Sequence, residues 1–361
     1  MMKLVVSCGG TGGHIMPGLA IADTVRRNDP RAEILFVGAR GGMEEDLVKK
    51  AGYRIKVLDV EGLIRRLTLK NIRVLINARR AVGEAEKLLL DFAPDVVCGT
   101  GGYASFPTLL AAARLGIPSA VHESNAVPGL AVRRLARRVD MVWLNFASAA
   151  DALPRGARYS VVGNPMRESW RTPVLRAKTG KRVLAFGGSL GAEKINDAVL
   201  DLMCAAREKQ DVSVLLASGK REYERVFAEF SSRSLSGEPR FRVVPFIHDM
   251  AREMAAADLV VCRAGAITLS ELSAARRAAI LVPSPNVTGD HQRKNAAALA
   301  GVGAAVLLDE NELSGETLTG RVFALLEDAN TREAMECAVG KFFNPRANQT
   351  IYEDILKLRR I

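Results

Sequence analysis

The chain has 361 residues, an average globular composition and a positive charge that is concentrated in its first half. Hydrophobic residues make up 48% and charged residues 25%, which excludes wholesale disorder and collagen-like structure. At roughly 150 residues per domain, the length predicts two domains. Residues 1–165 carry 23 Lys and Arg against 15 Asp and Glu, and residues 166–361 carry 28 against 25. This basic half can attract nucleic acid, anionic membrane or a phosphorylated substrate.

Short apolar strands separated by helical patterns occupy the first half. Because they lack polar alternation, they predict a parallel sheet covered on both faces, as in a doubly wound α/β domain. Two uncharged stretches are each broken by glycines and a proline, so we expect neither a membrane span nor a signal peptide, and a cytoplasmic chain. The expected strands are 4–7, 34–37, 55–58, 96–98, 120–122, 141–144 and 161–162.

The strand pattern stops at residues 163–165 and resumes at residue 183. We therefore expect a first domain at 1–165 and a second Rossmann-like domain at 166–344. The helical spacing of apolar residues after 348 predicts a terminal packing helix. We expect this helix to pack back on the first domain and so to join 345–361 to it. The expected strands of the second half are 183–186, 212–217, 241–244, 259–262, 280–283 and 305–308.

Three glycine-rich turns connect a strand to a helix: Gly9–His14, Gly99–Tyr103 and Gly187–Gly191. Unpaired N–H groups and the helix dipole make such turns suitable for phosphate. The first and third turns lack the G-x-G-x-x-G spacing, and the strands after them end without an acidic residue, which disfavours a dehydrogenase. The P-loop motif is absent as well, which disfavours a P-loop nucleotidase.

Two groups in these regions can carry chemistry. His14 follows the first glycine turn and titrates near neutral pH, so it is either a general base or a phosphate ligand. After the strand at 259–262, the N–H groups of residues 266–268 can face a phosphate. Glu271, about one turn into that helix, can accept hydrogen bonds from a ribose diol or can cap the helix.

A basic stretch at 62–83 contains six Lys and Arg, no acidic residue and interleaved Leu and Ile. It suits an anionic bilayer surface, or it is a solvated helix face. The stretch contains no aromatic residue for base stacking, which argues against RNA binding. A second basic cluster consists of Arg133, Arg134, Arg137 and Arg138.

Seven motifs, in order along the chain, resemble those of the MurG family of bacterial N-acetylglucosaminyltransferases. They are GGTGGH (9–14), GGYASFP (101–107), HESN (122–125), GNPMR (163–167), GGSLGA (187–192), RAGAITLSE (263–271) and DHQRKNA (290–296). The resemblance implies a GT-B fold, in which two Rossmann-like domains face a cleft. It also implies inverting transfer of N-acetylglucosamine from UDP-N-acetylglucosamine (UDP-GlcNAc) to the C4 hydroxyl of the muramoyl sugar of undecaprenyl-linked lipid I, which forms lipid II.

The resemblance extends to partners and location. The first domain would bind lipid I and an anionic membrane surface, the second domain would bind UDP-GlcNAc, and other cell-wall synthesis proteins are further expected partners. The chain would act at the cytoplasmic face of the inner membrane, with no cofactor, no metal and no nucleic acid. The alternative is another UDP-sugar-dependent GT-B transferase that acts on a glycolipid or a small aglycone.

The resemblance also assigns roles to individual residues. His14 becomes the candidate general base. The uracil would lie beside the backbone of Ile247 with Arg167 nearby, the ribose hydroxyls on Glu271, and the sugar on Gln292. The other expected donor contacts are Thr11, Gly12, Gly13, Asn125, Ser189, Ala266, Ile267, Thr268, Leu269 and Ser270. The expected residues on the acceptor side are Tyr103, His122, Glu123 and Arg137.

Overall fold

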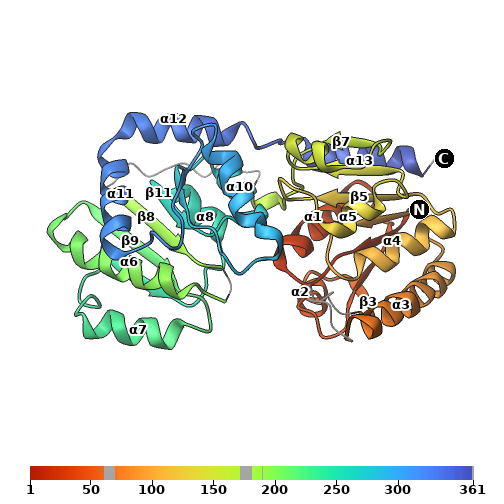
Figure 1. Ribbon diagram of the computed structural model, residues 1–361, viewed down its shortest axis with the longest axis horizontal. Helices are drawn as coiled ribbons and strands as arrows, with labels where there is room; N and C mark the ends of the chain where they lie inside the picture. The colour runs from red at the N-terminus through yellow and green to blue at the C-terminus, as the bar shows by residue number, and fades with distance from the viewer. Residues whose placement is uncertain (61–69, 171–180, 189, 360–361) are drawn as a thin grey trace. The chain divides into compact units, whose positions relative to one another are not determined.

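The computed structural model describes residues 1–60, 70–170, 181–188 and 190–359, and only the backbone of residues 70–78 and 288. The chain divides into two compact units, Met1–Glu168 with Asn344–Ile361 (unit 1) and Ser169–Phe343 (unit 2) (Figure 1). Unit 1 extends past the expected boundary at 165 because Arg167 and Glu168 pair with side chains of its first helix. It begins again at Asn344, whose amide nitrogen donates to the Val162 carbonyl over 2.8 Å.

Unit 1 contains a seven-stranded sheet with strand order β3-β2-β1-β4-β5-β6-β7, and every adjacent pair is parallel. Every strand expected in the first half is present. The strands are β1 (Lys3–Ser7), β2 (Glu33–Ala39), β3 (Arg54–Leu58), β4 (Val96–Gly99), β5 (Ser119–Glu123), β6 (Met141–Leu144) and β7 (Tyr159–Val161). The α-helices of this unit are α1 (Gly12–Asn28), α2 (Glu44–Lys50), α3 (Lys70–Phe92), α4 (Ser105–Arg114), α5 (Leu130–Leu135) and α13 (Ala347–Leu358).

The C-terminal helix α13 belongs to unit 1, as expected (Figure 1). Ile351, Ile355 and Leu358 lie in the same buried core as β1 and α1. The indole N–H of the fully buried Trp143 on β6 donates to Asp354 over 3.1 Å. Burial of the apolar face and pairing of the indole therefore both hold the end of the chain on the first domain.

Unit 2 contains a six-stranded parallel sheet with strand order β10-β9-β8-β11-β12-β13. The strands expected in the second half are again present, with ends that differ by at most two residues. They are β8 (Lys181–Phe186), β9 (Val212–Ala217), β10 (Phe241–Val244), β11 (Leu259–Cys262), β12 (Ala279–Leu281) and β13 (Val306–Leu307). The α-helices are α6 (Glu193–Ala205), α7 (Tyr223–Ser232), α8 (Met250–Ala256), α9 (Ala266–Ala275), α10 (His291–Ala300), α11 (Gly315–Glu327) and α12 (Ala329–Gly340).

Each sheet has one point at which the strand order reverses. It lies between β1 and β4 in unit 1 and between β8 and β11 in unit 2. In open α/β sheets, ligands bind beyond the carboxyl ends of the strands at this switch point. The described loop residues there are 8–11 and 100–104 in unit 1, and 187–188, 190–192 and 263–265 in unit 2. These are the loops that carry the predicted chemistry.

Within the described ranges, none of the helices combines the length and the apolar composition that a membrane crossing requires.

Candidate active site

His14 lies in the first turn of α1, at the switch point of unit 1. Its Nδ1 atom is 2.9 Å from the Thr100 carbonyl oxygen, and the Thr100 hydroxyl donates to the His14 carbonyl over 2.6 Å. A carbonyl oxygen only accepts, so Nδ1 carries the proton and Nε2 of the neutral ring carries the lone pair. The loop after β4 therefore fixes the tautomer that a general base at Nε2 requires.

A buried carboxyl group, that of Glu44, occupies part of the first glycine turn, and the sequence motif does not reveal it. Glu44, fully buried at the start of α2, accepts hydrogen bonds from the N–H of Gly10 over 3.1 Å and from that of Ala39 over 2.8 Å. A Cβ atom at Gly9 or Gly42 would lie within 2.5 Å of this carboxylate. Both glycines thus leave space for Glu44, and the Gly10 N–H is not available to a phosphate.

The available donors of this turn lie further along, at the helix start. Thr11 is the N-cap of α1, and its side chain makes no capping hydrogen bond. The first helical turn, which includes Gly12 and Gly13, contains no acidic residue. An uncapped helix N-terminus without a competing carboxylate favours an anion or a developing negative charge. The structure therefore narrows the predicted phosphate contact from the whole turn to residues 11–13.

The HESN segment at the end of β5 is held by buried hydrogen bonds. His122 Nε2 lies 3.0 Å from the Gly163 carbonyl, and burial lowers the pKa of His122 to about 4. Glu123 accepts from the N–H and the side-chain amide of Asn125, both over 2.9 Å, and from the Gly129 N–H over 2.8 Å. His122 and Glu123 therefore fix the conformation of the segment through buried hydrogen bonds, and these bonds position Asn125.

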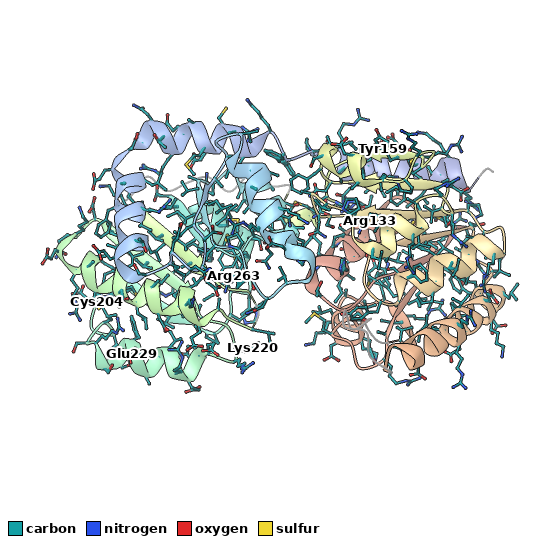
Figure 2. All side chains as sticks on the ribbon, in the orientation of Figure 1. Arg133, Tyr159, Cys204, Lys220, Glu229 and Arg263 are labelled. Atoms are coloured by element: carbon teal, nitrogen blue, oxygen red, sulfur yellow. The ribbon has the colours of Figure 1, made fainter. Side chains whose placement is uncertain are left out.

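The other two residues expected on the acceptor side are at the surface. Tyr103 is 54% exposed, on the loop after β4 and beside Gly10. Arg137 is exposed together with Arg133, Arg134 and Arg138, on and just after α5. Tyr103 thus adjoins the glycine turn, whereas Arg137 belongs to a basic surface (Arg133 is labelled in Figure 2).

Glu271 lies on α9 in unit 2, directly after the switch-point strand β11. Burial raises its pKa to about 8. The pKa of the neighbouring Cys262 thiol is raised as well, mainly by burial of the thiol and further by the charge of Glu271. Among the described residues, no hydrogen bond or ion pair engages the Glu271 carboxylate, and the N-cap of α9 is Gly265. The capping alternative for Glu271 is therefore wrong, and the carboxylate is available to a ligand.

The start of α9 is also arranged for a ligand. No side chain caps this terminus, so the N–H groups of Ala266, Ile267 and Thr268 face the loop. By contrast, the Leu269 N–H donates to the Gly265 carbonyl and the Ser270 hydroxyl donates to the Ala266 carbonyl, each over 3.0 Å. The polar groups of Leu269 and Ser270 thus bond within the helix, and a substrate contact for either residue stays a prediction.

Gln292, near the start of α10, has a defined orientation. Its Oε1 atom accepts from the Ser284 N–H over 2.9 Å, so its amide N–H₂ group points away from the backbone of that segment. Arg263 (labelled in Figure 2) pairs with Glu310 and donates to the carbonyls of Val282 and Pro283 over 3.2 and 3.1 Å. These bonds connect the turn after β11 to residues 282–284, whose backbone orients Gln292.

The third glycine turn packs tightly in unit 2. A Cβ atom at Gly191 would lie 2.2 Å from the Ser218 carbonyl oxygen, and Ser218 also accepts from the Asn196 amide over 3.0 Å. Asn196 is fully buried, and its Oδ1 atom has no partner among the described residues. Sequence reasoning missed Asn196, although a polar residue in the first turn after a glycine loop is a signal. The predicted Ser189 lies outside the described residues.

The predicted uracil position lies after β10. The side chain of Ile247 is buried, whereas the neighbouring Phe246 is 42% exposed. The ring of Phe246 packs edge-on against His248 at 5.3 Å, with the Lys220 ammonium 5.7 Å from its centre. An exposed aromatic ring next to a cation is a suitable surface for a base. Phe246 is a second residue that the sequence analysis missed.

Comparison with known proteins decides the family. Residues 4–144 match the glycosyltransferase family 28 N-terminal domain and residues 182–351 match the family 28 C-terminal domain. Two relatives bear the name UDP-N-acetylglucosamine–N-acetylmuramyl-(pentapeptide) pyrophosphoryl-undecaprenol N-acetylglucosamine transferase. The relative from Limosilactobacillus fermentum is 40% identical to this chain over 92% of each chain. The relative from Acetivibrio thermocellus is 39% identical over 99% of each chain. The chain belongs to the MurG family of glycosyltransferases.

Solved structures agree with this family. The crystal structure of Acinetobacter baumannii MurG is 28% identical and has a TM-score of 0.80, covering 99% of this chain and 100% of that one. The structure of UDP-GlcNAc 2-epimerase from Neisseria meningitidis, at 15% identity and a TM-score of 0.68, covers 99% of this chain and all of that one and shares the fold alone. The expected GT-B class with two Rossmann-like domains is therefore confirmed.

Unit 2 of this MurG-family chain also has a cavity of about 340 Å³ that does not suit a diphosphate. Four carboxylates line it against one cation, Arg293, which already pairs with Asp309 over 2.6 Å. Glu310 pairs with Arg263, so Asp290 and Glu312 remain as negative lining groups. The negative lining repels an anion. The lining residues are Pro283, Ser284, Pro285, Asp290, Arg293, Asp309, Glu310, Asn311 and Glu312.

Across the described ranges, no group of three or more His, Cys, Asp or Glu side chains could hold a metal ion. Metal independence stays a prediction.

Proposed function

We propose that this chain transfers N-acetylglucosamine from UDP-GlcNAc to the C4 hydroxyl of the muramoyl sugar of lipid I, with inversion, and so forms lipid II. The relatives at 37–40% identity bear the name of this transfer. The observation that carries the proposal is Glu271, a carboxyl group that the fold buries in large part without giving it a partner among the described residues. An unpaired buried acceptor is costly unless a ligand satisfies it.

In the donor site, we assign the ribose to Glu271 and the diphosphate to the uncapped N-terminus of α9. A carboxylate accepts from both hydroxyls of a vicinal diol, and the N–H groups of residues 266–268 supply donors with the positive end of the helix dipole. The amide N–H₂ of Gln292 would donate to the sugar, and Phe246 would contact the uracil beside Ile247.

The chemical step needs a base on the acceptor hydroxyl and stabilisation of the departing UDP. His14 Nε2 is the proposed base, because its Nδ1–H is committed to the Thr100 carbonyl. As the C4 oxygen attacks the anomeric carbon, its proton passes to Nε2 and the bond to the UDP oxygen breaks with its electron pair on the diphosphate. Helix N-termini stabilise that charge without a metal.

Titration calorimetry without added metal tests this assignment. We expect UDP-GlcNAc to bind the wild type, UDP-glucose to bind more weakly and NAD not to bind. Glu271→Ala should abolish donor binding, whereas Glu224→Ala, which removes an exposed carboxylate on α7, should not change it. Undiminished binding by Glu271→Ala, or binding of NAD in place of the UDP-sugar, would overturn the assignment. A lipid I assay with and without EDTA then tests transfer and metal independence.

We also propose peripheral contact with an anionic membrane at the cytoplasmic face. The basic stretch at 62–83 falls largely outside the described side chains, but its Arg79 and Arg80 are exposed. The four exposed arginines of the α5 region have no ion-pair partner among the described residues, and the adjacent Leu130 is 51% exposed. Unpaired cations beside an exposed apolar side chain suit an anionic bilayer.

A further inference from the structure

The buried carboxyl group of Glu44 is enclosed by main chain. Glu44 is the first residue of α2, and its fractional exposure is zero. A Cβ atom at Gly9, Gly38 or Gly42 would lie 2.6 Å or less from an atom of its side chain. No cation pairs with it in the part of the chain that the structure describes. A buried carboxylate without a cation is costly unless hydrogen-bond donors satisfy it, so its two backbone donors are its compensation.

These two donors lie where the ladder between β1 and β2 would otherwise continue. The last backbone bond of this ladder runs from the Cys8 N–H to the Val37 carbonyl over 3.1 Å. In a regular parallel pair the next donors would be the N–H groups of Ala39 and Gly10. Both donate to Glu44 instead, to Oε1 and to Oε2. The carboxylate therefore replaces two bonds of the sheet and connects the glycine turn to the end of β2.

The loop after β4 contacts the same turn from another side. A Cβ atom at Gly102 would lie 2.1 Å from the Gly9 carbonyl oxygen, and one at Gly101 would lie 2.4 Å from His14 Nδ1. Both glycines have positive φ, +86° and +100°, which other residues rarely adopt. The turn is thus held between this loop and Glu44, with no side chain between the loop and the turn.

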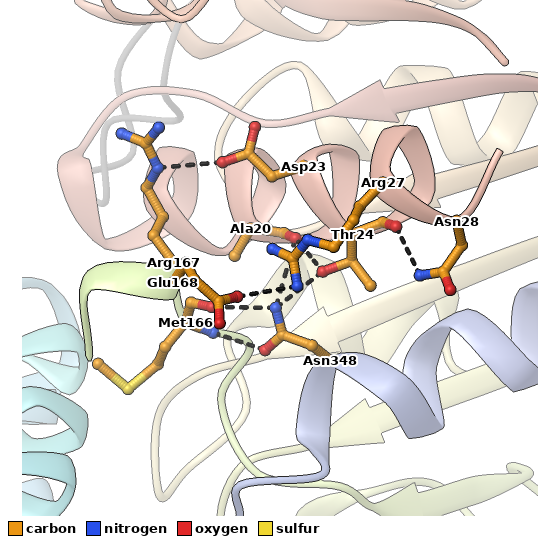
Figure 3. A network of polar contacts seen from close by, with 9 residues as sticks. All are labelled: Ala20, Asp23, Thr24, Arg27, Asn28, Met166, Arg167, Glu168 and Asn348. Carbon is orange, nitrogen blue, oxygen red and sulfur yellow. Dashed lines mark hydrogen bonds and ion pairs between the residues drawn. The ribbon is translucent and has the colours of Figure 1, made fainter. Parts of the chain in front are cut away.

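The second half of α1 is anchored separately (Figure 3). Asn348 donates to the Thr24 hydroxyl over 2.9 Å, and Arg27 pairs with Glu168 over 2.8 Å. These contacts lie at least two helical turns after His14. The placement of the first turn of α1 therefore depends on the contacts around residues 9–14.

We propose that Glu44 is a positioning residue for the transfer reaction. Its carboxylate fixes the main chain of Gly9 and Gly10, and through it the first turn of α1, which carries His14. Consecutive glycines have many accessible conformations, and Gly10 has a φ of +80°, so the turn needs an external contact to adopt one of them. This inference rests on the proposed function, in which His14 is the base. Glu44 is fully buried and acts through His14 rather than on a substrate.

Glu44→Gln tests this role, because glutamine has the same length but only one acceptor oxygen. Its amide N–H₂ group would face one of the two N–H donors, so we expect the turn to move. The kcat for transfer to lipid I should fall by about 10- to 100-fold, the loss expected for a displacement of about 1 Å. UDP binding measured by calorimetry should not change, since the proposed ribose and diphosphate contacts lie in unit 2.

A comparison with His14→Ala separates positioning from general damage. If Glu44 acts through His14, Glu44→Gln should lower kcat no further when it is added to His14→Ala. Glu45→Gln is the matched control. Glu45 is the next residue of α2 and is 29% exposed, and it accepts from the Gly41 N–H over 2.6 Å instead of from the turn. Its removal should leave kcat unchanged.

Gly42→Ala is a second variant, which keeps the carboxylate and displaces it. Gly42 lies outside the turn and does not have a positive φ, so alanine fits its backbone. The added Cβ atom would lie 2.4 Å from Glu44 Oε2. We expect kcat to fall as in Glu44→Gln. When Gly42→Ala is added to Glu44→Ala it should have no further effect, because the displaced group is absent.

The outcomes are distinct. Unchanged kcat in Glu44→Gln, an equal further loss in His14→Ala, or a parallel loss of UDP binding would overturn the positioning role. Failure of both Glu44→Gln and Gly42→Ala to give the wild-type circular dichroism spectrum would also overturn it and assign Glu44 to stability. All of these results leave the proposed function intact. A wild-type protein that binds no UDP-sugar and does not use lipid I would overturn the proposed function itself, and the positioning role with it.

Discussion

Glu271→Gln is the substitution for which the structure predicts opposite effects on ligand binding and on stability. Burial raises the pKa of Glu271 from 4.5 to about 8. Below pH 4.5 the carboxyl is protonated in both the folded and the unfolded chain, so it has no effect. Between pH 4.5 and 8 the unfolded chain loses this proton and the folded chain retains it, so the stability of unit 2 falls as the pH rises.

The size of this effect follows from about 1.36 kcal/mol per pKa unit. The wild type loses about 3 kcal/mol at pH 7 and about 5 kcal/mol at pH 9, and these are upper values because the side chain keeps partial contact with water. Glutamine has the same shape and no charge, so Glu271→Gln removes the loss. The variant should therefore be more stable than the wild type by an amount that grows with pH, and it should bind UDP-GlcNAc more weakly because one of two acceptor oxygens is lost.

Urea unfolding at pH 5, 7 and 9, followed by hydrogen–deuterium exchange mass spectrometry, measures this difference and assigns it to unit 2. Glu224→Gln is the matched control, because Glu224 is exposed on α7 and pairs with no described residue. Its stability should differ from that of the wild type by a constant amount. Parallel stability curves for Glu271→Gln and the wild type across this pH range would refute the argument that burial without a partner raises the Glu271 pKa.

The remaining predictions concern binding, catalysis, the membrane and the C-terminus. Donor affinity should rise about tenfold per pH unit up to pH 8 and then level off, because the ribose binds the ionised Glu271. Calorimetry in two buffers measures the proton release that this pH dependence requires. Glu271→Gln should abolish both the proton release and the pH dependence. His14→Ala should lower kcat by about 100- to 10,000-fold with donor affinity unchanged, and equal losses in kcat and donor binding would point to a phosphate ligand instead. Reversing Arg133 and Arg137 to Glu should reduce flotation with anionic liposomes at least about tenfold, at about 1 kcal/mol per basic residue near the surface, whereas neutral liposomes should show no difference. Deletion of residues 347–361 should unfold unit 1, because it removes three core side chains and the partner of Trp143; a thermal transition for unit 1 that matches the wild type would contradict this.

Local patterns in the sequence were sufficient for the secondary structure and much of the site. Apolar runs predicted the thirteen strands found among the described residues, because such a run is recognised without long-range information. Burial differs between them: the central strands β1 and β4 are buried, whereas the edge strands β3 and β7 are partly exposed. Glycine turns after β1, β4 and β8 marked the switch-point loops, since the same local sterics recur wherever a strand turns into a helix. The apolar spacing after residue 348 predicted the helix α13 but not the surface on which it packs, which is the core formed with β1 and α1.

Tertiary structure decided which of these groups are available. The Gly10 N–H is occupied by Glu44, 34 residues away, and the His14 tautomer is fixed by Thr100, 86 residues away. Arg167 is held by Asp23 across 144 residues. Glu271 was ambiguous between a cap and a ligand until the fold showed it buried without a partner among the described residues. A residue type and its spacing determine what a side chain can do, but burial and hydrogen-bond partners depend on which distant segments the sheet brings together.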